Sequence, residues 1–219
     1  MCSPVNAFQE AVKRFNSIDP VRAAARSGAR FDRAGGRFEI VYFGSLYLVD
    51  LAGRVSRAAD PGGEVPFNDR TLIIQYLCEA SGPPPRGQWI SFLQLPDGAH
   101  HYVPLQTDAT VPLARVFGKS PDKFAEAAMA LGGRPLSMGD RSFLIPALPK
   151  IPLAVVIWEE DDEFPAKSNI LFDSVAPMHL TTAALWVLGV ELAHKMIAHC
   201  DREAGRERQI TWLEGVNND

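Results

Sequence analysis

The fold class of this 219-residue chain is decided by one stretch, residues 38–51, which reads FEIVYFGSLYLVDL. β-Branched and aromatic residues dominate both halves of the stretch, a composition typical of strands. Gly44 separates the two halves and supplies the backbone freedom that a tight turn needs. The stretch therefore predicts two antiparallel strands, joined as a hairpin or as a bulged ribbon.

A helix is expected after this pair of strands. Asn68 or Asp69 is positioned to cap a helix whose apolar residues recur at helical spacing up to Leu77. Gly82 can end this helix, and the three prolines at 83–85 cannot continue it. The segment from residue 38 to residue 81 thus reads strand, turn, strand, loop, helix.

The same order of elements recurs in the last third of the chain. Residues 153–158 and 169–172 read as strands, and Thr181 or Thr182 can cap a helix that runs to about Asp201. We therefore predict an α+β fold with antiparallel sheets covered by helices, in a single domain over residues 1–219. A finer hypothesis is that residues 35–82 and 150–201 form two similar ββα lobes joined by a middle segment.

The middle segment carries weaker signals. Residues 89–93 are strand-like, residues 96–98 form a Pro-Asp-Gly turn, and Tyr102 with Val103 is expected to return as the partner strand. Ser120 followed by Pro121 opens a helix that the glycine pair at 132–133 closes. Further strands are expected on either side of three prolines, Pro146, Pro149 and Pro152.

Composition excludes several classes of protein. Lys and Arg total 22 against 26 Asp and Glu, a formal charge of −4, which argues against a general polyanion binder and so against a nucleic-acid partner. The three cysteines, Cys2, Cys78 and Cys200, lack the spacing of a disulfide framework or of a metal site. The sequence shows no signal peptide and no bilayer span, so we expect a cytoplasmic protein without a membrane partner.

The strongest candidate site residues lie just before the last helix. Asp173 and His179 fall between a strand and a helix start, where helix N–H groups attract anions. Asp173, Ser174 and His179 invite comparison with a catalytic triad, but no nucleophile-elbow motif surrounds Ser174. Capping and loop hydrogen bonds explain Asp173 and Ser174 equally well. His179 is therefore the first candidate ligand-binding residue, with Asp173 beside it.

Other candidates are weaker. Of the adjacent His100 and His101, only one can face a pocket beside Tyr102 if the segment is a strand. The five acids at 159–163 lack the alternation and glycine of a calcium loop, so a solvated turn is favoured over a cation site. Glu191 and His194 form a single Glu-x-x-His pair, where dimetal bundles need two. No metal is predicted.

The second half of the chain carries four apolar and proline-based motifs: LPKIPL at 148–153, Trp158, DEFP at 162–165 and LFD at 171–173. In these motifs the chain resembles an uncharacterised domain-of-unknown-function family of anaerobic bacteria and archaea, over about residues 38–198. Members of that family occur alone or joined to a four-cysteine iron–sulfur module of the kind found in corrinoid proteins, and this module is absent here. At the start of the last helix the family pattern has an acidic pair where this chain has Ala183 and Ala184, which argues against a carboxylate site there.

Three functions remain open at this point. The resemblance implies a ligand-binding or accessory domain for a corrinoid or other tetrapyrrole, in a groove between the lobes lined by His101, Tyr102 and His179. A small-molecule enzyme could instead use Asp173 and His179 for acid–base chemistry. A homodimeric interaction or scaffold protein could use the last helix, whose residues 185–192 are apolar all round, unless this helix is central in the core.

Overall fold

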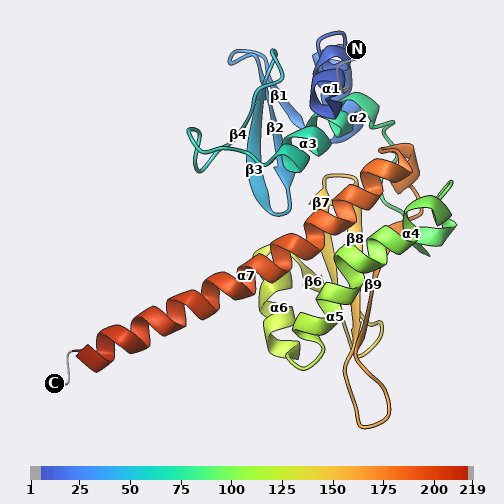
Figure 1. Cartoon of the computed structure of the whole chain (residues 1–219). Coiled ribbons are helices and arrows are strands. Elements are labelled where there is room, and N and C mark those ends of the chain that lie inside the picture. Colours follow the sequence, from blue (N-terminus) through green and yellow to red (C-terminus); the bar gives the residue numbers. More distant parts are fainter. Residues whose placement is uncertain (1–5, 217–219) are drawn as a thin grey trace, which may run out of the picture.

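The structure is a computed structural model that describes residues 6–216, with side chains up to Glu203. Two antiparallel sheets and the helices that cover them make up the described chain, which confirms the α+β class (Figure 1). The first sheet has the order β1-β2-β3-β4, with strands Arg30–Asp32, Arg37–Tyr42, Ser45–Asp50 and Val55–Arg57. The second has the order β5-β9-β8-β7-β6, with β5 Trp89–Ser91, β6 Arg134–Pro135, β7 Arg141–Leu148, β8 Ile151–Trp158 and β9 Lys167–Asp173.

Helices precede, separate and follow the strands. The α-helices are α1 Ala7–Phe15, α2 Pro20–Ser27, α3 Phe67–Glu79, α4 Ala99–Leu105, α5 Val111–Phe117, α6 Pro121–Ala130 and α7 Thr182–Val216. Two 3-10 turns, Phe92–Gln94 and Ala176–Met178, and a π-helical turn, Gln106–Thr110, complete the described elements. None of the described helices is long and apolar enough to cross a membrane.

The β2–β3 hairpin is the element that joins the two sheets. Tyr42 pairs with Ser45, so only Phe43 and Gly44 form the turn, with φ angles of 45° and 73°. Positive φ at both central residues gives the turn that suits the twist of a two-residue hairpin. The Phe43 N–H donates to the Ala147 carbonyl of β7 at 3.0 Å, which fixes the hairpin tip against the second sheet.

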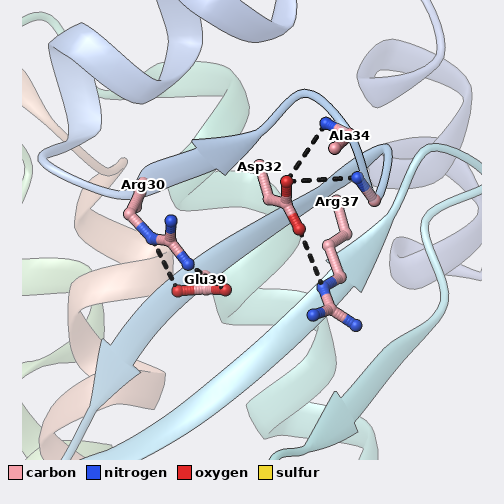
Figure 2. Close-up of polar contacts among 6 residues, drawn as sticks. Arg30, Asp32, Ala34, Arg37 and Glu39 are labelled. Carbon is pink, nitrogen blue, oxygen red and sulfur yellow. Dashed lines mark hydrogen bonds and ion pairs between the residues drawn. The ribbon is translucent and has the colours of Figure 1, made fainter.

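Side chains set the geometry of the β1–β2 hairpin (Figure 2). Asp32 accepts hydrogen bonds from the backbone N–H groups of Ala34 and Gly35, both at 3.1 Å, and pairs with Arg37 at 3.6 Å. The Gly35 N–H, more than any other neighbour, lowers the pKa of Asp32. Arg30 and Glu39, which face each other in the register, form a two-pronged ion pair. These contacts explain why residues 30–39 form a hairpin although the sequence signal there is weak.

The β7–β8 hairpin contains prolines that were expected to lie outside the strands. Pro146 and Pro152 face each other near the end of the hairpin, beside a register shift. Neither proline lies where a backbone N–H would have to bond to a third strand. β6 pairs only with Phe143 and Leu144 of β7, and β9 pairs with β8 only from Leu153 onward. The two strands therefore extend past the prolines, which corrects the shorter strands predicted from the sequence.

The segment predicted as the return strand at Tyr102 and Val103 is helical, so that prediction is wrong. β5 pairs instead with β9, placing Trp89 opposite Asp173. Residues 99–117 form α4, the π-helical turn and α5 in succession. Buried Leu105 and Leu113 pack this helical layer into the core, and the layer also contacts α7. Burial of this helical stripe outweighs the local turn signal.

Helix α7 lies across the molecule and covers both halves (Figure 1). Thr181 caps it by accepting a hydrogen bond from the Ala184 N–H at 3.3 Å, as predicted. Its apolar first half packs on α3, α4, α5 and α6. This segment therefore packs within the core of its own chain, as the sequence allowed. The helix continues to Val216, beyond the expected end near Asp201.

Both segments proposed as lobes contain an antiparallel strand pair followed by a helix, β2–β3 with α3 and β8–β9 with α7. Most buried apolar residues of both segments belong to one continuous core cluster. Whether the two segments are a true repeat stays a prediction.

Candidate functional site

A cleft of about 580 Å³ lies between the first sheet and α7. Its walls come from β2, the hairpin turn, β3 and β4 on one side, and from α7 with the end of α6 on the other. The lining residues are Tyr42, Phe43, Ser45, Tyr47, Arg57, Ala130, Leu131, His194, Lys195, Ala198, His199 and Arg202. Elements far apart in the sequence thus converge on one concave surface.

The cleft is rich in basic groups although the chain as a whole is acidic. Arg57, Lys195 and Arg202 supply three permanent cations, and His194 and His199 add two imidazoles. Within residues 6–203 the lining contains no Asp or Glu side chain, whereas the whole chain carries a formal charge of −4. A concave surface lined by cations concentrates the positive electrostatic potential and so attracts anions.

Helical periodicity places the α7 residues together. His194, Lys195, Ala198, His199 and Arg202 recur at steps of one, three or four residues and therefore share a face of the helix. Residues 188–193 of this helix are buried, but the side chain of His194 is 59 % exposed. The cleft begins where α7 passes from the core to the surface.

Strand register places Arg57 in the cleft. Arg57 of β4 lies directly opposite Tyr47 of β3. Its Nη2 donates to the Tyr47 hydroxyl at 3.3 Å, and the guanidinium carbon lies 5.7 Å from the centre of the Tyr47 ring. The hydrogen bond to Tyr47 raises the pKa of Arg57. These contacts hold a charged guanidinium against the cleft wall.

A buried carboxylate lies behind the cleft. Asp69 of α3 is completely buried, and its two oxygens accept hydrogen bonds from the Tyr42 hydroxyl at 2.9 Å and from Lys195 Nζ at 2.7 Å. The Lys195 ammonium also lies 5.2 Å and 5.7 Å from the ring centres of Tyr42 and Phe43. Burial, reinforced by Asp69, raises the pKa of Tyr42 well above its usual value. Tyr42 is therefore a neutral donor at physiological pH.

This Tyr42–Asp69–Lys195 network orients the ammonium of Lys195. The carboxylate approaches Lys195 from the protein interior and does not line the cleft, while Lys195 does. Charge-assisted hydrogen bonds of this kind are shorter and stronger than neutral ones. The arrangement can hold the Lys195 ammonium in a fixed position and offset part of the free energy that its desolvation costs. It does so without placing a carboxylate where an anion would bind.

The sequence was compared with known families and proteins. The profile of a family described as "Domain of unknown function (DUF3786)" matches residues 19–195. The chain belongs to this family. No curated protein and no solved structure is significantly similar to it. The DUF3786 region begins earlier than the resemblance to residues 38–198 implied. It includes Tyr42, Asp69 and Lys195 but ends before His199 and Arg202.

In this DUF3786 chain, the two leading candidates from the sequence, His179 and Asp173, bind the backbone of residues 82–88. We call this proline-containing segment the strap. His179 is completely buried, and its Nε2–H donates to the Pro83 carbonyl at 3.0 Å. Asp173 accepts hydrogen bonds from the backbone N–H groups of Arg86 and Gly87, at distances of 2.7 to 3.2 Å. Lys150 Nζ also donates to a carbonyl of the strap, that of Gly82. Both His179 and Asp173 therefore have partners within the chain itself.

The other two sequence candidates lie on α4. The His101 ring stacks on Trp186 of α7 with a centroid distance of 5.1 Å and an angle of 10°. The Tyr102 hydroxyl accepts from Gln106 Nε2 at 3.3 Å. Neither residue lines the cleft, and neither has a polar contact with His179 among the described residues. The structure thus brings His179 and Asp173 to the strap, and leaves His101 and Tyr102 on a separate helix.

Glu191 contributes to the frame of the cleft. Its Oε1 accepts from Asn68 Nδ2 at 2.7 Å and lies 3.8 Å from His194 Nδ1. In residues 6–203 no three His, Cys, Asp or Glu side chains are grouped so as to hold a metal ion.

Sequence reasoning missed Asp69, which was treated only as an alternative cap. Helix α3 begins at Phe67 after Pro66, without a side-chain cap, and Asp69 lies inside its first turn. One signal could have indicated the site, because Lys195 interrupts the apolar run of α7 and Asp69 opens the apolar run of α3. Isolated charges at the edges of two buried helices are expected to pair.

Proposed function

We propose that this protein binds a small polyanionic molecule, such as a phosphate ester or a polycarboxylate, in the cleft between the first sheet and α7. The observation that carries the proposal is the convergence of Arg57, Lys195 and Arg202, with two imidazoles, in a concave site whose described lining residues include no carboxylate. Arg57 offers the planar donor fork that suits phosphate and carboxylate groups. Lys195 offers a compact charge in a fixed position.

Packing supports the proposal because the site is built before a ligand arrives. Asp69 and Tyr42 hold Lys195, and Tyr47 holds Arg57. A ligand that binds pre-positioned donors loses less affinity to side-chain ordering. Arg202 and His199 have no hydrogen-bond or ion-pair partner within the described part of the chain, so their donors are available to a ligand.

Calorimetric titration with inorganic phosphate, pyrophosphate and citrate at low ionic strength tests the proposal. We expect binding that weakens as sodium chloride is added, because added ions screen the attraction between exposed charges. The double variant Arg57→Gln, His199→Gln should bind at least tenfold more weakly. Arg22→Gln is the matched control, since Arg22 is exposed on α2 and does not line the cleft.

Two results would overturn the proposal. One is the absence of binding of all three anions to the unaltered protein at low salt. The other is equal affinity of the double variant and the unaltered protein, with both folded as judged by circular dichroism and melting temperature.

A corrinoid or other tetrapyrrole is the finer identity that the family resemblance implies for the ligand. Because tetrapyrroles commonly carry anionic side groups, we assign such a ligand to the same cleft. Visible absorption of protein purified without oxygen, followed by titration with cobalamin and with haem, tests this identity. A spectral shift that the double variant loses would support it. Phosphate binding without any spectral shift would retain the anion site and reject the tetrapyrrole.

A further inference from the structure

Arg70 is a half-buried cation without an anionic partner. It follows Asp69 in α3 but contacts α1, where its guanidinium carbon lies 4.8 Å from the centre of the Phe8 ring. The Phe67 ring lies 5.6 Å away. Its Nε is buried and has no hydrogen-bond acceptor. Within residues 6–203, no carboxylate pairs with this guanidinium.

Stacking on two rings satisfies none of the N–H groups of a guanidinium. Arginine carries five donors in the plane of the group, and the end formed by its two Nη groups matches the two oxygens of a carboxylate. The buried Nε faces the protein interior, where no ligand reaches it, whereas the Nη groups are not buried and have no acceptor within residues 6–203. The donors that Arg70 offers to the pocket that it lines are therefore its Nη–H groups.

This pocket has a volume of about 340 Å³ and a mostly apolar wall. It is lined by Phe8, Val12, Ala52, Gly53, Arg54, Val55, Val65 and Arg70. The second cation, Arg54, lies near Asp50 at 3.9 Å and has an 85 % exposed side chain. The pocket therefore combines one unpaired guanidinium with an apolar surface from α1, β4 and the segment before α3.

We propose that this pocket binds a small organic carboxylate with an apolar body, with Arg70 as the partner of the carboxylate. The two Nη groups of Arg70 donate to the two carboxylate oxygens, while the side chains of Phe8, Val12, Val55 and Val65 contact the hydrocarbon part of the ligand. A monoanion fits better than phosphate, because a single unpaired cation in a mostly apolar wall cannot replace the hydration of a dianion. The site is independent of the basic cleft, since the two share no lining residue.

Methyl-resolved NMR with hexanoate, acetate, hexanol and inorganic phosphate as probes tests this inference. We expect hexanoate to shift the methyl signals of Val12, Val55 and Val65 in a saturable way. Acetate lacks the apolar body and hexanol lacks the charge, so each should bind at least tenfold more weakly than hexanoate. Phosphate should leave these three residues unperturbed.

Three variants separate binding from folding. Arg70→Met keeps apolar contact with the Phe8 ring but removes every donor, and should weaken hexanoate binding at least tenfold. Arg70→Lys restores the charge without the two-pronged geometry, and should recover only part of the affinity. Arg22→Met, the matched control, removes an exposed arginine of α2 that does not line the pocket and should change the affinity less than threefold.

A purely structural role for Arg70 would give different results. In that case Arg70→Met would lower the melting temperature while hexanoate would not shift the valine methyl signals of the unaltered protein, and the inference would be overturned. Equal binding of hexanoate and hexanol, or equal loss of affinity in the Arg22 and Arg70 variants, would overturn it too. If Arg70→Met does not fold, the comparison of hexanoate with hexanol on the unaltered protein decides.

Discussion

Lys195 is the residue on which the basic cleft depends, because it neutralises the fully buried carboxylate of Asp69 behind the site. Asp69 is fully buried, and removal of its cationic partner leaves an uncompensated charge. We expect Lys195→Met to lower the free energy of unfolding by about 3–5 kcal/mol. Tyr42→Phe, which removes one hydrogen bond to the same carboxylate, should cost about 1.5–3 kcal/mol.

Urea denaturation of the two single variants and the double variant measures these costs. Since both side chains bind the same carboxylate, their effects should not be additive. Strict additivity would mean that Tyr42 and Lys195 act independently, and would contradict the description of the three residues as one network.

His179 makes stability depend on pH. Burial lowers the pKa of His179 in the folded chain below its ordinary value of about 6.5. The unfolded chain therefore takes up a proton as pH falls through about 6.5 while the folded chain does not, so stability is present above this pH and is lost below it. We expect the melting temperature to fall between pH 7.5 and pH 5.5, and to fall less in His179→Gln.

The glutamine variant retains an N–H that can donate to the Pro83 carbonyl, so it tests the titration and not the hydrogen bond. The Asn variant of an exposed histidine, His100→Asn, is the control. If acidification lowers the melting temperature of His179→Gln as much as that of the unaltered chain, another group controls the pH dependence of stability.

At the scale of elements, the β2–β3 hairpin requires glycine at its tip. Gly44 has a φ of 73°, and a Cβ there would lie 3.0 Å from the carbonyl group of Leu131. Gly44→Ala combines backbone strain with a backbone clash, and should lower the free energy of unfolding by about 1–3 kcal/mol. Gly62→Ala, where a Cβ meets no atom within 4 Å, should change it by less than about 0.5 kcal/mol.

Chemical denaturation of both alanine variants measures the difference. Because the hairpin turn also lines the basic cleft, Gly44→Ala should weaken phosphate binding while Gly62→Ala should not. Equal stability of the two variants would show that the hairpin tip can move away from α6 without cost.

The elements that local chemistry determines could be predicted from the sequence. Asp19 caps α2 with Pro20 in the first position, Gly28 ends it in the left-handed conformation, and Thr181 caps α7. The β2–β3 hairpin follows from its strand composition and Gly44. In each case the deciding contacts are within a few residues of one another.

Elements and sites that depend on distant partners could not be predicted. Whether residues 99–105 form a helix depends on burial against α7, and the pairing of β5 with β9 joins residues about 80 positions apart. Asp69 and its partner Lys195 are 126 positions apart in the sequence. No local pattern therefore indicates that Asp69 is more than a helix cap. The sequence predicts His179 and Asp173 as ligand-binding residues, whereas in the structure both form hydrogen bonds to the backbone of the strap.

At the scale of the whole molecule, the two sheets should unfold together. One continuous core cluster joins them, and the hairpin tip, α3 and α7 bridge both halves. The four tryptophans all lie at or after position 89, so their fluorescence reports the second sheet and α7. Circular dichroism reports the helices and strands of both halves. We expect coincident urea transitions by the two probes.

Fluorescence and circular dichroism midpoints that differ would contradict this expectation and would favour two lobes that are stable on their own. Saturating pyrophosphate should raise both midpoints equally if the molecule unfolds as a unit, because the cleft is built from both halves.

The π-helical turn at Gln106–Thr110 keeps the buried residues of the helical layer 99–117 on one face. Four core residues on this helical layer, Leu105, Ala109, Leu113 and Phe117, are spaced by four, and 12 residues span about three and one-third α-helical turns. A plain helix would rotate Phe117 away from the face that Leu105 occupies. The wider turn absorbs one residue, which leaves 11, or about three full turns. At this turn the chain can therefore lose one residue and become a regular helix with the same buried face, whereas a deletion within α5 would rotate the residues that follow it out of the core.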